Sequence, residues 1–260
     1  DFRVFRNNSN MIVIDIGNTD IVIGIYTKHK LDKTLRFNTK SKNTIRLIKS
    51  RFTNQYIYRL KIKYKICILS SVVPEINNKI KNLFKSLKFK VLNITTNNIP
   101  FDIQFNYQPK ELGSDRIANT FAAIKKYGNN CLIIDFGTAT TFDVIKNNKY
   151  EGGVIAPGID ISHDALVKYA SKLKKISIIR TKSLVGNNTK DSMQSGFYWG
   201  YISLINGVID KIIKQQRFKP TIILTGGLAN IFKKEISQKT EYEPNLTLNG
   251  LYLIGKIKYA

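Results

Sequence analysis

The chain has 260 residues, of which 43% are hydrophobic and 23% charged, so it is neither disordered nor fibrous and fits two modest domains or one large one. It carries 42 basic against 18 acidic residues, a formal net charge of +24. No run approaches the ~18 consecutive apolar residues of a membrane-spanning helix, and residues 1–10 lack a secretory pattern, which predicts a soluble cytoplasmic protein without membrane contact.

The first half of the chain opens with a strand, a tight polar turn and a second strand. Apolar runs flank Asp15–Thr19 within Met11–Tyr26, and Gly17 and Asn18 supply the turn chemistry. Further strands are expected at Lys28–Phe37, Lys65–Ser70 and Val91–Ile94, and helices at Asn43–Lys49, Pro74–Leu87 and Gly113–Tyr127.

The second half repeats this opening. Leu132–Ile145 again has an apolar run, an Asp-x-Gly turn and a second apolar run, and Asp135 follows Asp15 at an offset of 120 residues. Two such units predict a duplicated α/β domain with a cleft between the halves. We place the boundary near residue 116, so that residues 11–116 carry the first turn and residues 117–260 carry the second turn and the substrate elements.

The remaining elements are expected in a less regular order. Residues 151–158 predict a stiff, turn-rich loop because they contain three glycines and a proline. The elements expected around this loop are a helix from about Ile161, a long helix Ser192–Gln216, a buried strand Thr221–Thr225, a helix from about Leu228, and a strand with a short helix over Leu246–Lys258.

The positive charge does not by itself predict a nucleic-acid partner. Lysine supplies 33 of the 42 basic residues and is spread along the chain, whereas nucleic-acid surfaces favour arginine. Drift toward AT-rich codons explains the abundance of lysine, asparagine and isoleucine. The two cysteines, Cys67 and Cys131, lie in apolar runs and predict buried thiols rather than a disulfide, a zinc site or an iron–sulfur site.

The two turns have the composition of polyphosphate-binding loops. A glycine lets backbone N–H groups approach phosphate oxygens, threonine and asparagine donate further bonds, and an aspartate binds Mg²⁺ directly or through water. Each turn alone is equally compatible with an ordinary hairpin, but the pair favours a nucleotide. The Walker A pattern is absent from the sequence.

Six short blocks then occur in a fixed order. They are DIGNT (15–19), LGSDR (112–116), DFGTATTFD (135–143), GGVIAPG (152–158), NTKDSMQSG (188–196) and LTGG (224–227). Each is common alone, but the ordered set resembles the type III pantothenate kinases of the actin/acetate-and-sugar-kinase superfamily over roughly residues 11–255.

The resemblance implies duplicated actin-like (ribonuclease H-like) domains with an interdomain cleft. It also implies ATP-dependent phosphorylation of the 4′-hydroxyl of pantothenate, the first step of coenzyme A biosynthesis. The implied cofactors are ATP, Mg²⁺ and a monovalent cation, K⁺ or NH₄⁺. The implied partner is a second copy of the chain in a homodimer.

The resemblance assigns roles to particular residues. Asp115 corresponds to the general base, and Asp135 to the ligand of the monovalent cation. The residues that correspond to ATP contacts are Asp15, Ile16, Gly17, Asn18, Thr19, Asp20, Ile21, Val22 and Thr138. Those that correspond to pantothenate contacts are Gly113, Ser114, Asp115, Arg116 and Thr189, with Tyr107 in place of an aromatic residue that the family has where Asn106 stands.

Several alternatives stay open at this stage. From its position alone Asp115 is a helix cap, and Arg116 either binds the substrate carboxylate or bridges the domains. Asp20 adds a negative charge beside the expected phosphates, and Ser114 replaces a common alanine. The chain as a whole is alternatively another small-molecule kinase of the superfamily or a non-catalytic, nucleic-acid-binding regulator on the same fold.

Overall fold

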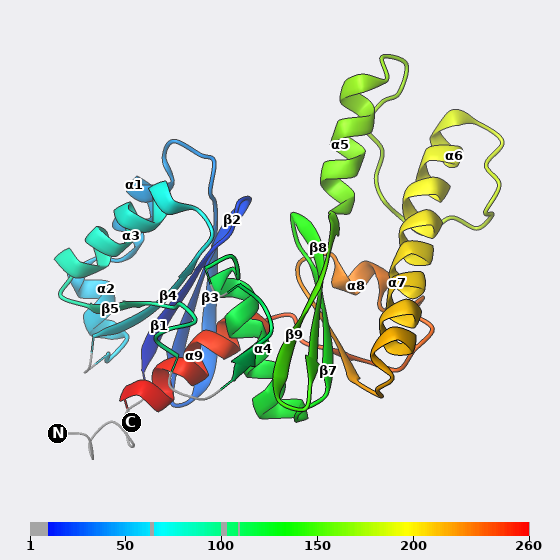
Figure 1. The fold of residues 1–260 in the computed structure, drawn as a ribbon. Coiled ribbons are helices and arrows are strands. Elements are labelled where there is room, and N and C mark those ends of the chain that lie inside the picture. The colour runs from blue at the N-terminus through cyan, green and yellow to red at the C-terminus, as the bar shows by residue number, and fades with distance from the viewer. Residues whose placement is uncertain (1–9, 63–64, 100–102, 109, 260) are drawn as a thin grey trace. The chain divides into compact units, whose positions relative to one another are not determined.

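The computed structural model describes residues 10–62, 65–99, 103–108 and 110–259 (Figure 1). The chain divides into two compact units, the first comprising residues up to Lys126 together with the segment from Asn245, and the second Tyr127–Pro244. This division differs from the boundary expected near residue 116, which falls inside a helix of the first unit. The C-terminal segment also returns to the first unit instead of completing the second.

In the first unit the strands follow the order β3-β2-β1-β4-β5. β2 is antiparallel to its neighbours, whereas β4 is parallel to β1 and β5 is parallel to β4. The strands are β1 (Met11–Ile16), β2 (Asp20–Thr27), β3 (Lys30–Asn38), β4 (Ile66–Ser71) and β5 (Lys90–Asn93). The two-residue strand β6 (Gln104–Phe105) is not part of this sheet. The helices are α1 (Thr44–Arg51), α2 (Asn54–Arg59), α3 (Pro74–Ser86), α4 (Ser114–Tyr127) and α9 (Leu246–Tyr259).

Helices cover both faces of this sheet (Figure 1). Ile12 and Ile14 of β1 pack in one buried cluster with side chains from α1, α2 and α3, while α9 contacts β1 and β4. A Cβ at Gly255 would lie 2.6 Å from the Met11 sulfur, so glycine lets α9 lie close to β1. The strand with a short helix expected over Leu246–Lys258 is therefore wrong, because the segment is one helix that packs on the first sheet.

In the second unit the strands follow the order β11-β10-β7-β8-β9. β8 is antiparallel to β7 and β9, and β10 is parallel to β7 and β11. The strands are β7 (Cys131–Phe136), β8 (Ala139–Lys146), β9 (Lys149–Pro157), β10 (Thr221–Thr225) and β11 (Thr240–Tyr242). The helices are α5 (Ile159–Tyr169), α6 (Thr189–Ser195), α7 (Tyr201–Gln216) and α8 (Ala229–Phe232).

The two sheets are built on one plan. β7 and β8 match β1 and β2 in length and in their alternation of buried and half-buried residues. The turns differ by one residue, because the Gly17 amide donates to the Asp20 carbonyl, whereas the Gly137 amide donates to the Ala139 carbonyl. The duplicated α/β fold that the repeated Asp-x-Gly turns predict is confirmed.

Two other expectations for the second unit are wrong. Residues 151–157 belong to β9 rather than to a loop, because this segment pairs with β8 and Gly152 and Gly153 lie in the ladder. The helix expected over Ser192–Gln216 begins earlier, at Thr189, and contains a π-helical segment at Gly196–Gly200 between α6 and α7. Such π-helical segments often occur at functional sites.

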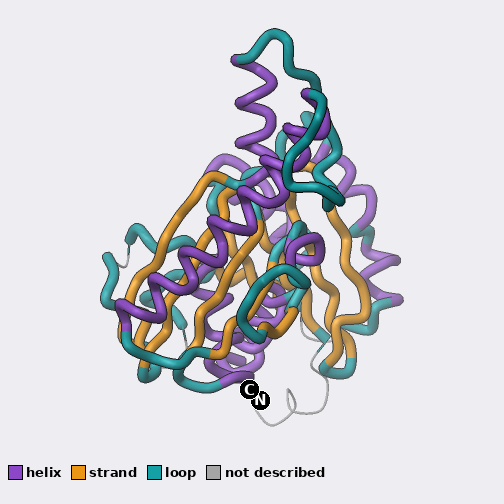
Figure 2. Tube along the Cα trace, turned by 90° about the vertical axis from the view of Figure 1, so that its right-hand side faces the viewer, coloured by secondary structure: helices purple, strands orange, loops and turns teal. Residues whose placement is uncertain are grey.

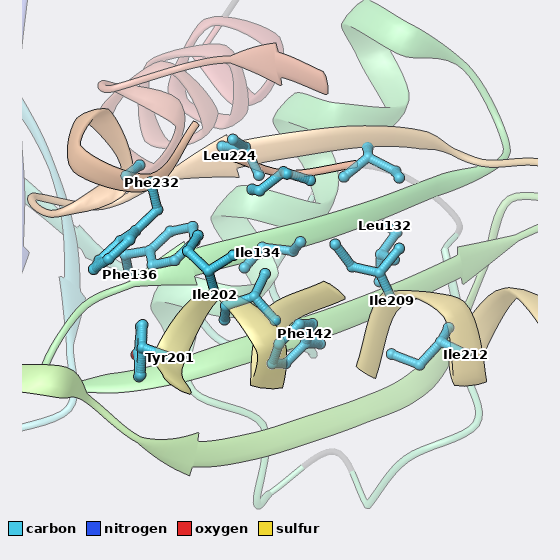
Figure 3. Close-up of a cluster of buried hydrophobic side chains, with 14 of the residues drawn as sticks. Leu132, Ile134, Phe136, Phe142, Tyr201, Ile202, Ile209, Ile212, Leu224 and Phe232 are labelled. Atoms are coloured by element: carbon cyan, nitrogen blue, oxygen red, sulfur yellow. The ribbon is translucent and has the colours of Figure 1, made fainter. Parts of the chain in front are cut away.

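The core of the second unit lies between its sheet and α7. Figure 3 shows Ile202 and Ile209 of α7 directed toward Ile134 and Leu132 of β7, and all four belong to one buried cluster. Figures 1 and 2 show α5 and the chain that follows it extending beyond the strands of this unit. No helix within the described part of the chain is long and apolar enough to cross a membrane.

Candidate active site

The first polar turn joins β1 to β2 and is fixed by a residue from the end of β3. The Gly17 amide donates to the Asp20 carbonyl at 2.9 Å. Thr39, which is buried, donates its hydroxyl to the Gly17 carbonyl and its amide to the Thr19 carbonyl, both at 2.8 Å. These bonds hold the backbone of the turn in one shape while Asn18 and Thr19 stay exposed.

The side chains around this turn divide into two groups. Ile16 and Ile21 are fully buried, so any ligand contact at these two positions would come from the backbone. Asp15 and Val22 are half-buried. Asp20 accepts a 2.7 Å hydrogen bond from Arg36 of β3, and this ion pair neutralises the extra negative charge that the sequence places beside the turn.

The first residues of α4 lie beside the same sheet edge. Asp15 of β1 is paired in register with Ser70 of β4, and the Ser70 hydroxyl lies 3.0 Å from the Ser114 hydroxyl at the start of α4. Neighbouring strands are ~4.8 Å apart. The structure therefore brings Asp115 close to the first turn within one unit.

Asp115 is half-buried at the first turn of its helix. Its Oδ1 accepts a 2.8 Å hydrogen bond from the Arg116 amide. Burial raises the pKa of the Asp115 carboxyl, and the backbone hydrogen bond and the positive charge of Arg116 oppose that rise in part. A Cβ at Gly113 would collide with Asp115 Oδ1, so glycine is required for this arrangement. A carboxylate with a raised pKa is a better proton acceptor than an exposed aspartate.

Arg116 is buried and lies over an aromatic ring. Its guanidinium carbon is 5.7 Å from the centroid of the Tyr107 ring, which is a cation–π distance. Asn106, next to Tyr107, is exposed. The structure therefore associates Tyr107 with the Gly113–Arg116 element.

The second turn is enclosed by two glycines from distant segments. A Cβ at Gly226, which has a φ of +90°, would lie 2.5 Å from Asp135 Oδ1 and 2.6 Å from the Phe136 amide nitrogen. A Cβ at Gly158 would lie 2.6 Å from the Gly137 carbonyl oxygen, and the Gly158 amide donates to the Thr138 carbonyl at 3.1 Å. Both glycines let backbone approach the turn where a side chain would not fit.

Thr189 lies elsewhere in the second unit, at the first position of α6. The Asn188 side chain caps this helix by accepting from the Asp191 amide at 3.0 Å. Thr189 lines a cavity of about 720 Å³, and the other lining residues are Leu166, Gly186, Asn187, Asn188, Ser192, Met193, Gly196 and Phe197. The cavity thus includes the start of the π-helical segment.

The structure groups the predicted site residues by unit. The Asp15–Val22 turn, Tyr107 and the Gly113–Arg116 element belong to the first unit, and Asp135, Thr138 and Thr189 to the second. Thr39, Ser70, Gly158 and Gly226 are not among the site residues predicted from the sequence. The two glycines could have been chosen because they stand in the GGVIAPG and LTGG blocks, whereas Thr39 and Ser70 have no comparable signal.

The sequence as a whole is similar to known proteins. The family profile described as "Type III pantothenate kinase" matches residues 11–211. A type III pantothenate kinase from Roseiflexus sp. (strain RS-1) is 37% identical over 260 residues, covering 94% of this chain and 97% of the relative. The chain belongs to the type III pantothenate kinase family.

Solved structures extend the likeness to the fold. A Baf family protein from Campylobacter jejuni superimposes with a TM-score of 0.61 at 21% identity, covering 94% of this chain and 96% of that one. MreB5 of Spiroplasma citri, solved with bound ADP, gives a TM-score of 0.52 at 13% identity and covers 96% and 97%. At these identities the likeness shows the fold alone, which is the duplicated actin-like fold expected of a type III pantothenate kinase.

Proposed function

We propose that this chain transfers the γ-phosphoryl group of ATP to the 4′-hydroxyl of pantothenate, giving 4′-phosphopantothenate in the first step of coenzyme A biosynthesis. The observation that carries this proposal is the pairing of Asp15 with Ser70, whose hydroxyl contacts Ser114, because it puts the candidate base Asp115 beside a phosphate-type turn. Membership of the type III pantothenate kinase family supplies the substrate.

Asp115 is the proposed general base. An alcohol is a weak nucleophile at neutral pH, so a carboxylate must orient it and accept its proton as the new bond to phosphorus forms. The raised pKa of Asp115 favours proton acceptance, and the Arg116 amide fixes one of its oxygens. Arg116 and Tyr107, stacked on one another, are the proposed contacts for the pantothenate carboxylate and carbon chain, together with Gly113 and Ser114.

The first turn is the proposed binding element for the ATP phosphates. The proposed phosphate contacts are Asp15 and the backbone from Ile16 to Val22, and Thr39 holds the turn in shape. Mg²⁺ usually takes one or two carboxylates together with phosphate oxygens, and the half-buried Asp15 carboxylate fits that donor set. When bound, Mg²⁺ neutralises charge that develops on the phosphoryl oxygens.

The second turn is proposed to contact ATP through Thr138 and to bind a monovalent cation, K⁺ or NH₄⁺, through Asp135. Hard cations prefer carboxylate and carbonyl oxygens. The close approach of Gly226 to Asp135 supports this role, because it fixes the carboxylate at the end of β7. Thr189 is proposed to contact pantothenate from the cavity that it lines.

The chain is proposed to act as a cytoplasmic homodimer. Apolar side chains are exposed on β9, on α5 and in the chain that follows α5: Ile155, Ile161, Tyr169, Leu184 and Val185, the last with 80% of its surface accessible. A second copy would bury side chains of this kind, because large apolar side chains on the surface of a protein often mark an interface. Two free buried thiols, Cys67 and Cys131, suit a reducing compartment.

One assay tests the activity directly. ADP release, measured with a coupled enzyme system, is expected to depend on pantothenate and to stay at background with glycerol, glucose or acetate. Turnover with a sugar but not with pantothenate would overturn the proposed substrate.

Light scattering of Val185→Asp tests the dimer, since a charged residue in the proposed interface should give monomers. An unchanged dimer would refute the proposed interface.

A further inference from the structure

The start of α4 is joined to the end of β4 through one serine hydroxyl. Ser114 Oγ lies 3.0 Å from Ser70 Oγ, accepts from the Ser71 amide at 2.8 Å and donates to the Ser71 carbonyl at 3.3 Å. A hydroxyl has one donor and two acceptor positions, so these contacts use its full capacity. Any contact of position 114 with substrate would therefore come from the backbone.

These contacts occur at the end of β4, where the neighbouring strand β5 no longer provides hydrogen-bond partners. β5 ends opposite Leu69, so Ser71 lies beyond its last paired residue, and Ser114 accepts the Ser71 amide there. On the other side β1 continues, with Asp15 opposite Ser70. Ser70 and Ser114 are both buried, with 0% and 8% of their surfaces exposed, so the hydrogen bonds are shielded from water.

We propose that Ser70 and Ser114 are positioning residues for phosphoryl transfer, which fix the Asp115 carboxylate at a set place relative to Asp15. The inference rests on the roles proposed above for Asp115 and Asp15. Ser114 immediately precedes Asp115, so a shift of the helix start moves the carboxylate with it. Catalytic groups must stay within ~0.5 Å of their productive geometry, and a displacement of ~1 Å can reduce turnover by about 10²-fold.

The first experiment compares Ser114→Ala, Ser70→Ala and the double variant. Each single change is expected to lower kcat by roughly 10-fold, with the KM for ATP within about twofold of the parent, because the turn proposed to bind the ATP phosphates is not part of the helix start. The double variant should be no worse than the poorer single variant, since both remove the same link. Ser86→Ala is the matched control, because it removes a similar serine hydrogen bond, 2.7 Å to the Leu83 carbonyl, at the far end of α3.

The second experiment follows Asp115 without using activity. Carbon-13 NMR of its carboxyl group should show a pKa above the usual ~3.9 in the parent protein and in Ser86→Ala. In Ser114→Ala and Ser70→Ala the pKa should fall toward that value as water enters beside a loosened helix start.

The two proposals fail in different ways. A parent-like kcat in Asp115→Asn would refute the role of Asp115 as the general base. The Asp115 titration in the serine variants would then be the test of whether the serine hydrogen bonds position this carboxyl group. The positioning role is overturned if either serine variant leaves the Asp115 titration unchanged, or if Asp115→Asn is impaired while Ser114→Ala keeps its kcat. The positioning role would also be overturned if the reductions in kcat of the two single variants were additive in the double variant.

Discussion

Replacing the Asp115 carboxylate by an amide separates its possible role as a base from its role at the helix start. In Asp115→Asn the side-chain oxygen can still accept the 2.8 Å hydrogen bond from the Arg116 amide, and the volume is nearly unchanged. The group that accepts a proton is lost. Removal of a general base lowers kcat by ~10²–10⁴-fold, which corresponds to about 3–5 kcal/mol of activation free energy.

The stability of the same variant carries a sign that can be checked. Because burial raises the pKa of Asp115 in the folded protein, its protonated form stabilises the native state at low pH, and this contribution is lost as the pH rises through the raised pKa. Asparagine does not titrate. The Tm of Asp115→Asn relative to the parent is therefore expected to rise as the pH increases above about 4, the pKa of an exposed aspartate. Because the helix-start bond is retained, the change in unfolding free energy should be at most about 1 kcal/mol.

The assay combines steady-state kinetics with thermal unfolding across that pH range. Asp32→Asn, which changes an exposed carboxylate on β3 of the same unit, is the control and should alter neither quantity. A folded Asp115→Asn protein with near-parent kcat would remove Asp115 from the mechanism. A Tm difference that falls with increasing pH would refute the raised pKa.

Three further changes test the two turns. Gly226→Ala should destabilise the second unit by about 2–4 kcal/mol in chemical denaturation, because the new Cβ would lie 2.5 Å from Asp135 Oδ1 on a backbone with φ of +90°. The control Gly227→Ala, whose Cβ would have nothing within 4 Å, should change stability by no more than about 0.5 kcal/mol. Equal destabilisation by the two substitutions would contradict the close packing of Gly226 on Asp135. Arg36→Gln should change stability by no more than about 0.5 kcal/mol, since the Asp20–Arg36 pair is exposed. The same substitution should raise the KM for ATP about twofold at low salt, because the charge of Asp20 is no longer neutralised. A KM that does not depend on salt would argue against this neutralisation. Asp135→Asn should weaken stimulation by K⁺, a prediction that fails if the parent enzyme is equally active in Na⁺ and K⁺.

The sequence by itself determined the repeated core of the fold. Apolar runs on either side of an Asp-x-Gly turn encode a strand, a turn and a strand through local backbone preferences, and their recurrence from Asp15 to Asp135 predicted the duplication. The six ordered blocks also indicated the family, because each block consists of several residues within one short segment of the sequence. Elements whose character depends on a distant partner were predicted less well. The helix α9 packs on β1 and β4, which lie more than 170 residues earlier in the chain, and residues 151–157 form a strand because they pair with β8.

Tertiary structure alone decided how the site is supported. Ser114 differs from a common alanine by one hydroxyl, and its importance appears only when Ser70 and Ser71, 44 and 43 residues earlier, are seen to contact it. In the sequence Asp20 is an uncompensated charge, and only the fold brings Arg36 across the hairpin to it. The sequence likewise does not distinguish Gly226 from Gly227, and only the fold packs Asp135 against Gly226. Periodicity and turn chemistry act between near neighbours in the chain, whereas hydrogen-bond partners and steric limits are set by which segments the fold packs together.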